Sequence, residues 1–134
     1  MKVKVFPLFL AFMALLLSTL ACEFSASTSN IAGAWMSTDE AGDQRTTVFA
    51  QDQIFYAQVD LQNAPDDTTL KAVWTAVNAQ DTDPNLVMTE TEFVTGSGLV
   101  NFNLSNESLW PTGTYKVDIY MDGTLSTTVE FEVQ

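Results

Sequence analysis

Hydrophobic and polar residues alternate along most of the chain beyond residue 30, a pattern typical of β-strands with one buried face. Successive side chains of a strand point to opposite faces, so every second residue of such a segment is expected in a core. On this basis Trp74 and Leu125 are both assigned to buried faces. The alternation is most regular in residues 70–77, 100–104, 115–121 and 125–133.

Three other parts of the chain favour strands less regularly. Residues 54–61 place four apolar side chains on one face. Residues 86–94 are rich in Thr and Val, but Glu90 and Glu92 interrupt them, so we expect this strand to run into solvent. An earlier strand is expected at 31–36 or at 46–49.

Clusters of Gly, Pro, Asn and Asp separate the predicted strands and mark turns at residues 63–67, 81–85, 96–98 and 111–113. Asp122-Gly123 predicts a two-residue hairpin between the last two strands, because a type I′ turn needs positive φ at both central positions. Beyond residue 22 we expect no helix of consequence. About seven short strands with regularly spaced turn signals predict an all-β protein, a sandwich or a barrel.

Tyr115 and Trp74 refine this prediction. Tyr115 opens its strand directly after a Pro-Thr-Gly turn, which resembles the tyrosine corner of immunoglobulin domains. Val117 and Val59 would then stand where such domains carry their paired cysteines, and Trp74 would be the core tryptophan. These residues favour an immunoglobulin-like antiparallel β-sandwich of about seven strands. The simpler alternative is that any sandwich fills its core with Tyr and Trp.

The N-terminus resembles a bacterial lipoprotein signal peptide. Lys2 and Lys4 precede an apolar run at residues 5–17, which has the length of a signal-peptide core and is too short to span a bilayer. The run leads to Leu-Ala-Cys, ending at Cys22. This segment is similar to a lipobox, whose cysteine is acylated and becomes the new N-terminus, although Thr19 stands where a lipobox favours Leu.

The resemblance implies three parts for the chain: a signal peptide at 1–21, the lipidated Cys22 with a tether at 22–30, and a β-sandwich domain at 31–134. The Ser/Thr-rich composition of the tether favours flexibility. A plain secretory signal that leaves a free thiol at Cys22 is the alternative. Lipidation predicts a protein anchored in the cell membrane or outer membrane, with its domain facing the periplasm or the extracellular space.

Acidic residues dominate the charge, with 17 Asp and Glu against 5 Lys and Arg and a net charge of −12. Beyond Ala21 only Arg45, Lys71 and Lys116 are basic, so three positive and 17 negative charges leave −14. Such a surface repels nucleic acid, whose binding depends on Lys and Arg at the phosphates. It is equally poor at docking on anionic lipid headgroups. These two classes of binding are therefore excluded.

The residue inventory argues against catalysis. The chain has no histidine, so the usual base of a nucleophilic triad is absent. Cys22 is the only cysteine, and acylation would remove it as a nucleophile and as a metal ligand. Paired carboxylates of the kind that cleave glycosidic bonds stay open in principle. A domain this small seldom has a deep pocket, so we expect neither an enzyme nor a cofactor.

Residues 81–92 carry oxygen donors at several ligand positions of an EF-hand calcium loop. In that twelve-residue window, positions 1, 3, 5 and 12 are Asp81, Asp83, Asn85 and Glu92. Position 6 should be Gly and is Leu86, so we prefer a turn that leads into a polar edge strand. Calcium held at one end of the sandwich by Asp66 and Asp67 together with Asp81 and Asp83 stays an alternative.

Four segments carry a wider resemblance: residues 47–50, 61–68, 71–74 and the Trp-Pro-Thr-Gly-Thr-Tyr-Lys-Val-Asp-Ile-Tyr run at 110–120. With them, residues 32–133 resemble a group of bacterial lipoproteins of uncharacterised function that have a single immunoglobulin-like domain. The resemblance implies the fold and the lipid anchor, and it implies no activity, ligand or catalytic residue.

Two classes of function fit these observations. In the first, the domain is a binding or adhesion module for another envelope protein or a glycan. Exposed aromatic residues would then be the anchors, because aromatics are enriched at interface hot spots; the candidates are Trp110, Tyr120 and Tyr56. In the second, the domain is a structural accessory subunit of an envelope complex with no small ligand.

Overall fold

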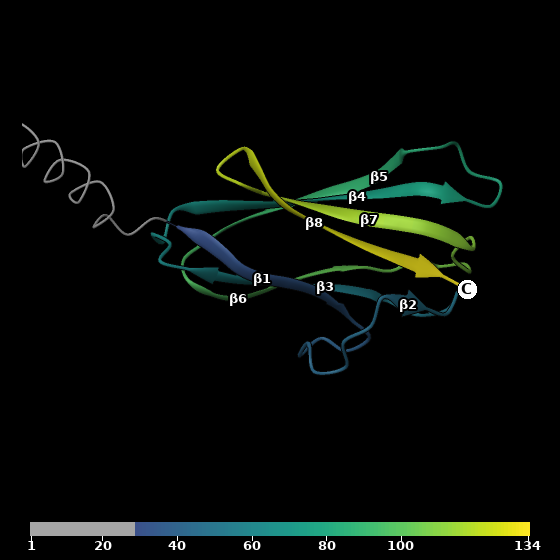
Figure 1. Cartoon of the computed structure of the whole chain (residues 1–134), viewed down its shortest axis with the longest axis horizontal. Coiled ribbons are helices and arrows are strands. Elements are labelled where there is room, and N and C mark those ends of the chain that lie inside the picture. The colour runs from purple at the N-terminus through teal and green to yellow at the C-terminus, as the bar shows by residue number, and fades with distance from the viewer. Residues whose placement is uncertain (1–28) are drawn as a thin grey trace, which may run out of the picture.

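In the computed structural model, which describes residues 29–134, eight strands form two sheets that pack face to face (Figure 1). Every strand predicted from the sequence is present. No helix in the described part of the chain is long and apolar enough to cross a membrane. The strands are β1 Asn30–Ser37, β2 Val48–Phe49, β3 Phe55–Gln62, β4 Thr68–Ala79, β5 Leu86–Thr95, β6 Gly98–Leu104, β7 Gly113–Met121 and β8 Thr124–Val133.

One sheet has three strands in the order β1-β3-β6, and the other has five in the order β2-β8-β7-β4-β5. All pairs are antiparallel except β2 with β8, which is parallel. The sequence left the first strand open between two segments, and the structure uses both of them, in different sheets. β5 is the last strand of the five-stranded sheet, and β6 is the last strand of the three-stranded sheet.

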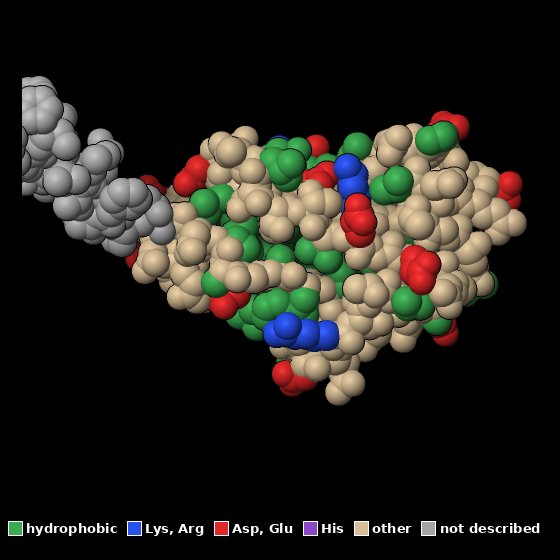
Figure 2. Space-filling view, viewed as in Figure 1, with side chains coloured by type: hydrophobic (Ala, Val, Ile, Leu, Met, Phe, Trp, Pro, Cys, Tyr) green, Lys and Arg blue, Asp and Glu red, His purple; other side chains and the backbone are tan. Residues whose placement is uncertain are grey.

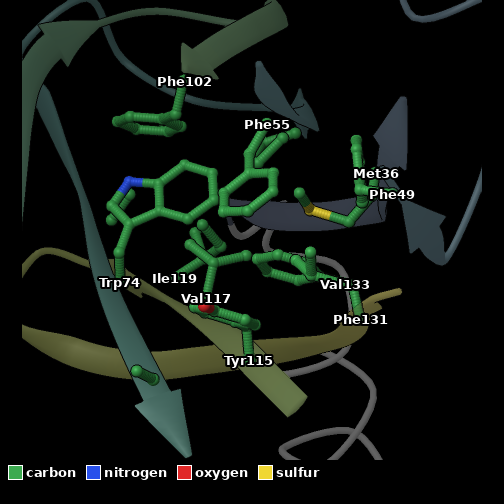
Figure 3. Close-up of a cluster of buried hydrophobic side chains, with 14 of the residues drawn as sticks. Met36, Phe49, Phe55, Trp74, Phe102, Tyr115, Val117, Ile119, Phe131 and Val133 are labelled. Atoms are coloured by element: carbon green, nitrogen blue, oxygen red, sulfur yellow. The ribbon is translucent and has the colours of Figure 1, made fainter. Parts of the chain in front are cut away.

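The core lies between the sheets and is rich in aromatic side chains. Trp74 is fully buried, as the alternation in its strand predicts, and its ring stacks on Phe55 of the opposite sheet at 6.3 Å between centroids. Figure 3 shows Phe102 and Phe55 pointing toward the Trp74 ring, with Phe131 and Tyr115 closing the cluster. Burying rings of this size supplies much of the hydrophobic stabilisation of a small domain.

The predicted tyrosine corner is present. The Tyr115 hydroxyl donates to the backbone oxygen of Pro111, four residues upstream, at 2.5 Å. Val59 and Val117 are both fully buried, in opposite sheets, so two valines occupy the core positions that the sequence assigned to them. Burial raises the pKa of the Tyr115 hydroxyl, because desolvation disfavours the phenolate.

The β7–β8 hairpin turns at Asp122 and Gly123, whose φ values of 49° and 83° are those a type I′ turn requires. A bulge follows, because the register shifts between Ile119 and Tyr120. Tyr120 therefore pairs with Leu125, which leaves the buried series of its strand and is 51% exposed. The prediction that Leu125 is buried is wrong, since one extra residue in a strand reverses the face of those beyond it.

The connection between β1 and β2 covers part of the outer face of the three-stranded sheet. Gln58 points outward from β3, yet it is buried beneath this connection. Its side-chain amide donates to the Glu40 backbone oxygen at 2.9 Å, and that of Asn101 donates to the same oxygen at 3.0 Å. Trp35 Nε1 donates to the Gly42 oxygen at 3.0 Å. These three bonds hold the connection over one row of the sheet.

The described residues begin close to the predicted domain boundary. β1 starts at Asn30, and the Ser29 hydroxyl donates to the Asn63 backbone oxygen. The predicted signal peptide at 1–21 and the predicted lipidation site Cys22 lie outside the described residues. Their assignment stays a prediction.

Candidate functional site

Trp110, predicted as an exposed anchor, lies in the core. It is 6% exposed, and its ring stacks on Phe55 at 4.4 Å between centroids. Its Nε1 donates to the Gln53 backbone oxygen at 2.9 Å, and its backbone nitrogen donates to the oxygen of Gln51. The prediction of an exposed Trp110 is therefore wrong, because the segment before the tyrosine corner folds back over the end of the sandwich.

Tyr120 and Tyr56 lie on the two outer faces and are half-buried. The Tyr120 ring carries the Lys71 ammonium nitrogen at 4.7 Å from its centroid, a cation–π contact between neighbouring strands. Tyr56 stands opposite Ser37 on one side and Asn103 on the other. On its other side Tyr120 stands opposite Leu125, which is 51% exposed.

The four EF-hand-like residues are not brought together. Asp81 and Asn85 belong to the β4–β5 turn, where both have positive φ, whereas Glu92 lies in the middle of β5 opposite Lys71. A strand advances about 3.3 Å per residue, so Glu92 lies roughly 20 Å beyond Asn85. The described residues contain no group of three or more His, Cys, Asp or Glu side chains placed to hold a metal ion.

The alternative calcium set is divided by a whole strand. Asp66 and Asp67 precede β4, and Asp81 and Asp83 follow it. Twelve residues of strand separate the two pairs, which corresponds to about 40 Å. The expectation that they share one end of the sandwich is wrong.

Two shallow concavities lie in the surface. One, of about 440 Å³, runs between β1 and β8, where Figure 2 shows hydrophobic side chains in the hollow. At its rim the Arg45 guanidinium lies 3.9 Å from the Trp35 ring centroid. The other, of about 380 Å³, includes Glu130 and Glu132 in its lining. Neither gathers the convergent polar groups that a catalytic site requires.

The free edge at β5 is the part of the described surface with the most apolar exposure. Nine large hydrophobic side chains are exposed, and five of them lie on β5 or at the start of β6. Their exposed fractions run from 42% to 66%. We name this surface the β5 edge and define it by Leu86, Val87, Phe93, Val94 and Leu99.

Alternation divides the side chains of the β5 edge between two faces. Phe93 pairs with the buried Leu70 and stacks on Phe102 of the opposite sheet at 5.1 Å between centroids. Val94 faces outward opposite Thr69 and is the most exposed of the five. The sequence predicted that residues 81–85 lead into a polar edge strand that runs into solvent, and the position of β5 at the end of its sheet confirms this prediction.

Solved structures similar to this chain share its fold. An immunoglobulin-like protein from Pseudomonas aeruginosa superposes with a TM-score of 0.51, at 18% identity, over 81% of this chain and 98% of that protein. A segment of the alkylpurine DNA glycosylase AlkC from Pseudomonas fluorescens superposes with a TM-score of 0.52, at 12% identity, over 82% of this chain and 31% of that enzyme.

No protein-family model matches the sequence, and a comparison with curated proteins finds no match. Identities below 20% in both structural neighbours restrict the likeness to the fold. The two facing sheets, the tyrosine corner and the structural neighbour together make the described domain an immunoglobulin-like β-sandwich.

Proposed function

We propose that this protein is a lipid-anchored envelope protein whose β-sandwich binds another envelope protein through the β5 edge. The observation that carries the proposal is that β5, a ten-residue strand paired only with β4, has one open edge and carries four of the nine exposed large apolar side chains, with a fifth at the start of β6. An open strand edge offers backbone donors and acceptors to an incoming strand, and apolar neighbours add affinity.

The other surfaces support the proposal by contrast. The β1–β2 connection covers part of the outer face of the three-stranded sheet. On the outer face of the five-stranded sheet, at β7 and β8, Lys116 and Thr128 both bind the Asp118 carboxylate. A role as a binding module without catalysis or cofactor fits a chain with no histidine and a single cysteine.

The lipid anchor is tested by labelling. In the bacterium that makes the protein, the full chain should incorporate an alkyne-tagged fatty acid and sediment with membranes. Cys22→Ser should lose the label, because the acylated thiol is gone. A wild-type chain that takes up no fatty acid would make the N-terminus a plain secretory signal and would leave the binding proposal untouched.

The binding role is tested by photo-crosslinking in intact cells at native expression. A photoreactive amino acid in place of Val94 should give one discrete protein adduct, identified by mass spectrometry. The matched control is Leu109, which is 61% exposed but lies in the β6–β7 connection. Adducts of equal yield at both positions, or none at Val94, would reject the β5 edge as the binding surface.

A further inference from the structure

β5 presents two carboxylates along its free edge that form no ion pair within residues 29–134. Glu90 and Glu92 are exposed, and their places opposite Val73 and Lys71 put them on the outer face of the sheet. Within residues 29–134 the one ion pair joins Lys116 to Asp118. Lys71, the direct cross-strand neighbour of Glu92, lies over the Tyr120 ring instead.

The same two glutamates disfavour a second copy of this chain as the partner that pairs with the open edge of β5. In an antiparallel self-pair about a two-fold axis, directly opposed residues share a face. The registers centred on Glu90, Thr91 or Glu92 therefore set Glu90 or Glu92 opposite Glu90 or Glu92 of the second copy. Like charges directly opposite destabilise a strand pair, and the large negative charge of the whole chain adds to the repulsion.

We propose that β5 pairs with an extended segment of another protein that carries Lys or Arg at two positions spaced two residues apart, facing Glu90 and Glu92. The spacing follows from the strand period, which brings alternate side chains to one face. Val87 and Val94 lie on the same outer face at either end of the glutamate pair, so apolar residues should flank the basic ones. This inference rests on the proposed function, because it names the chemistry of the partner that the β5 edge receives.

The test measures peptide binding to the full-length chain in detergent micelles by fluorescence anisotropy. The probe is a labelled nine-residue Thr/Val peptide with two lysines two residues apart, and its counterpart carries two glutamates instead. The lysine peptide should bind, and the glutamate peptide should not. Glu90→Gln with Glu92→Gln should weaken the lysine peptide about fivefold, the effect of losing two exposed charge pairs.

The matched control is Glu130→Gln with Glu132→Gln. These residues have the same spacing and the same charge, but β2 already pairs with β8 at Glu132, whereas no strand of the described chain pairs with the outer edge of β5. The control should weaken the lysine peptide less than twofold. Equal weakening by both double variants would mean that general attraction to an acidic protein explains the binding, and it would overturn the proposal.

A charge-reversal variant gives a second test of the same peptide binding. Glu90→Lys with Glu92→Lys should transfer binding from the lysine peptide to the glutamate peptide, because the strand pairing stays and only the charge match changes. Failure of the transfer, or a wild-type dimer that Val94→Arg dissociates, would overturn the proposal.

The outcomes also separate this inference from the proposed function. A Val94 adduct in cells together with no preference for the lysine peptide would leave the binding surface in place and reject the basic partner. A clear lysine preference without any adduct would keep the charge chemistry and reject the envelope partner at the β5 edge.

Discussion

Two regions of the sandwich use similar residues for opposite purposes. At one end, which we name the aromatic end, Phe49, Phe55, Trp110, Tyr115 and Phe131 are all buried and in contact with one another. At the β5 edge, large hydrophobic side chains are 42% to 66% exposed. Hydrophobic residue type alone therefore does not decide whether a side chain of this chain is buried. The position of its strand within the sheet decides it.

The polar groups of the two regions differ in the same sense. At the aromatic end the Tyr115 hydroxyl, Trp110 Nε1 and the Gln51 amide each donate to a backbone oxygen of a connection. At the β5 edge the carboxylates of Glu90 and Glu92 face solvent. A fully bonded end resists rearrangement, whereas an edge with open backbone groups is suited to receive another chain.

The largest effect is expected in the core beside the aromatic end. Trp74→Ala should lower the free energy of unfolding by about 3–5 kcal/mol, because it removes a fully buried ring and leaves a cavity. Since a small domain has about 5–10 kcal/mol in total, the variant should be barely folded. Urea unfolding followed by circular dichroism measures the loss.

Phe93→Ala is the matched control for the aromatic truncation at the β5 edge. Phe93 is 42% exposed and stacks on one ring, so we expect a loss of about 1 kcal/mol. If the two variants lose equal stability, the edge is as much a part of the core as Trp74 is, and the contrast between the regions fails.

A smaller effect is expected at the tyrosine corner. Tyr115→Phe keeps the buried ring but removes the hydrogen bond to Pro111, which should cost about 1 kcal/mol at neutral pH. Because burial raises the folded-state pKa of Tyr115, the folded state favours the neutral phenol. The neutral Tyr115 phenol therefore stabilises the folded state fully below the unfolded-state pKa of about 10. This stabilisation is lost as the pH rises through the folded-state pKa.

Urea unfolding between neutral pH and pH 11 checks this sign. Tyr115→Phe should be less sensitive to alkali than the wild type, because it lacks the hydroxyl whose ionisation burial disfavours. Identical alkaline profiles for wild type and Tyr115→Phe would mean that the corner hydroxyl ionises as freely in the folded state as in the unfolded one.

Much of the fold follows from local pattern. Alternation predicts the strands, and it places Trp74 in the core correctly because β4 keeps its period of two around that residue. The Asp122-Gly123 hairpin and the Tyr115 corner are equally local, since each depends on residues within a few positions of one another.

The predictions that the structure contradicts depend on how segments distant in the sequence are arranged in space. Leu125 is exposed because of a bulge, which depends on how β8 registers against β7. Trp110 is buried because its loop returns over Phe55, more than fifty residues away in the chain. The acidic pairs on either side of β4 do not share an end, because a single strand separates them and its two ends lie at opposite ends of the sandwich. Chain separation alone does not give distance in space.

The candidate site was only partly predictable for the same reason. Glu90 and Glu92 reveal from sequence that one strand meets solvent. The prediction of a polar edge strand is confirmed, but which strand β5 pairs with emerges only when the order β2-β8-β7-β4-β5 is known. The contribution of the aromatics was misjudged, because the expected anchor Trp110 serves the core and the exposed aromatic at the edge is Phe93.

The smallest effect is expected when one substitution is made in both regions. Val94→Thr should change the free energy of unfolding by less than about 0.5 kcal/mol, because Val94 is 66% exposed and the added hydroxyl meets water. Val117→Thr makes the same change at a fully buried position and should cost about 1–3 kcal/mol, since the hydroxyl is placed in an apolar core. Urea unfolding of the two variants side by side gives the difference. If Val94→Thr is as costly as Val117→Thr, the outer side of β5 is buried in the folded chain, and it offers no surface for a partner.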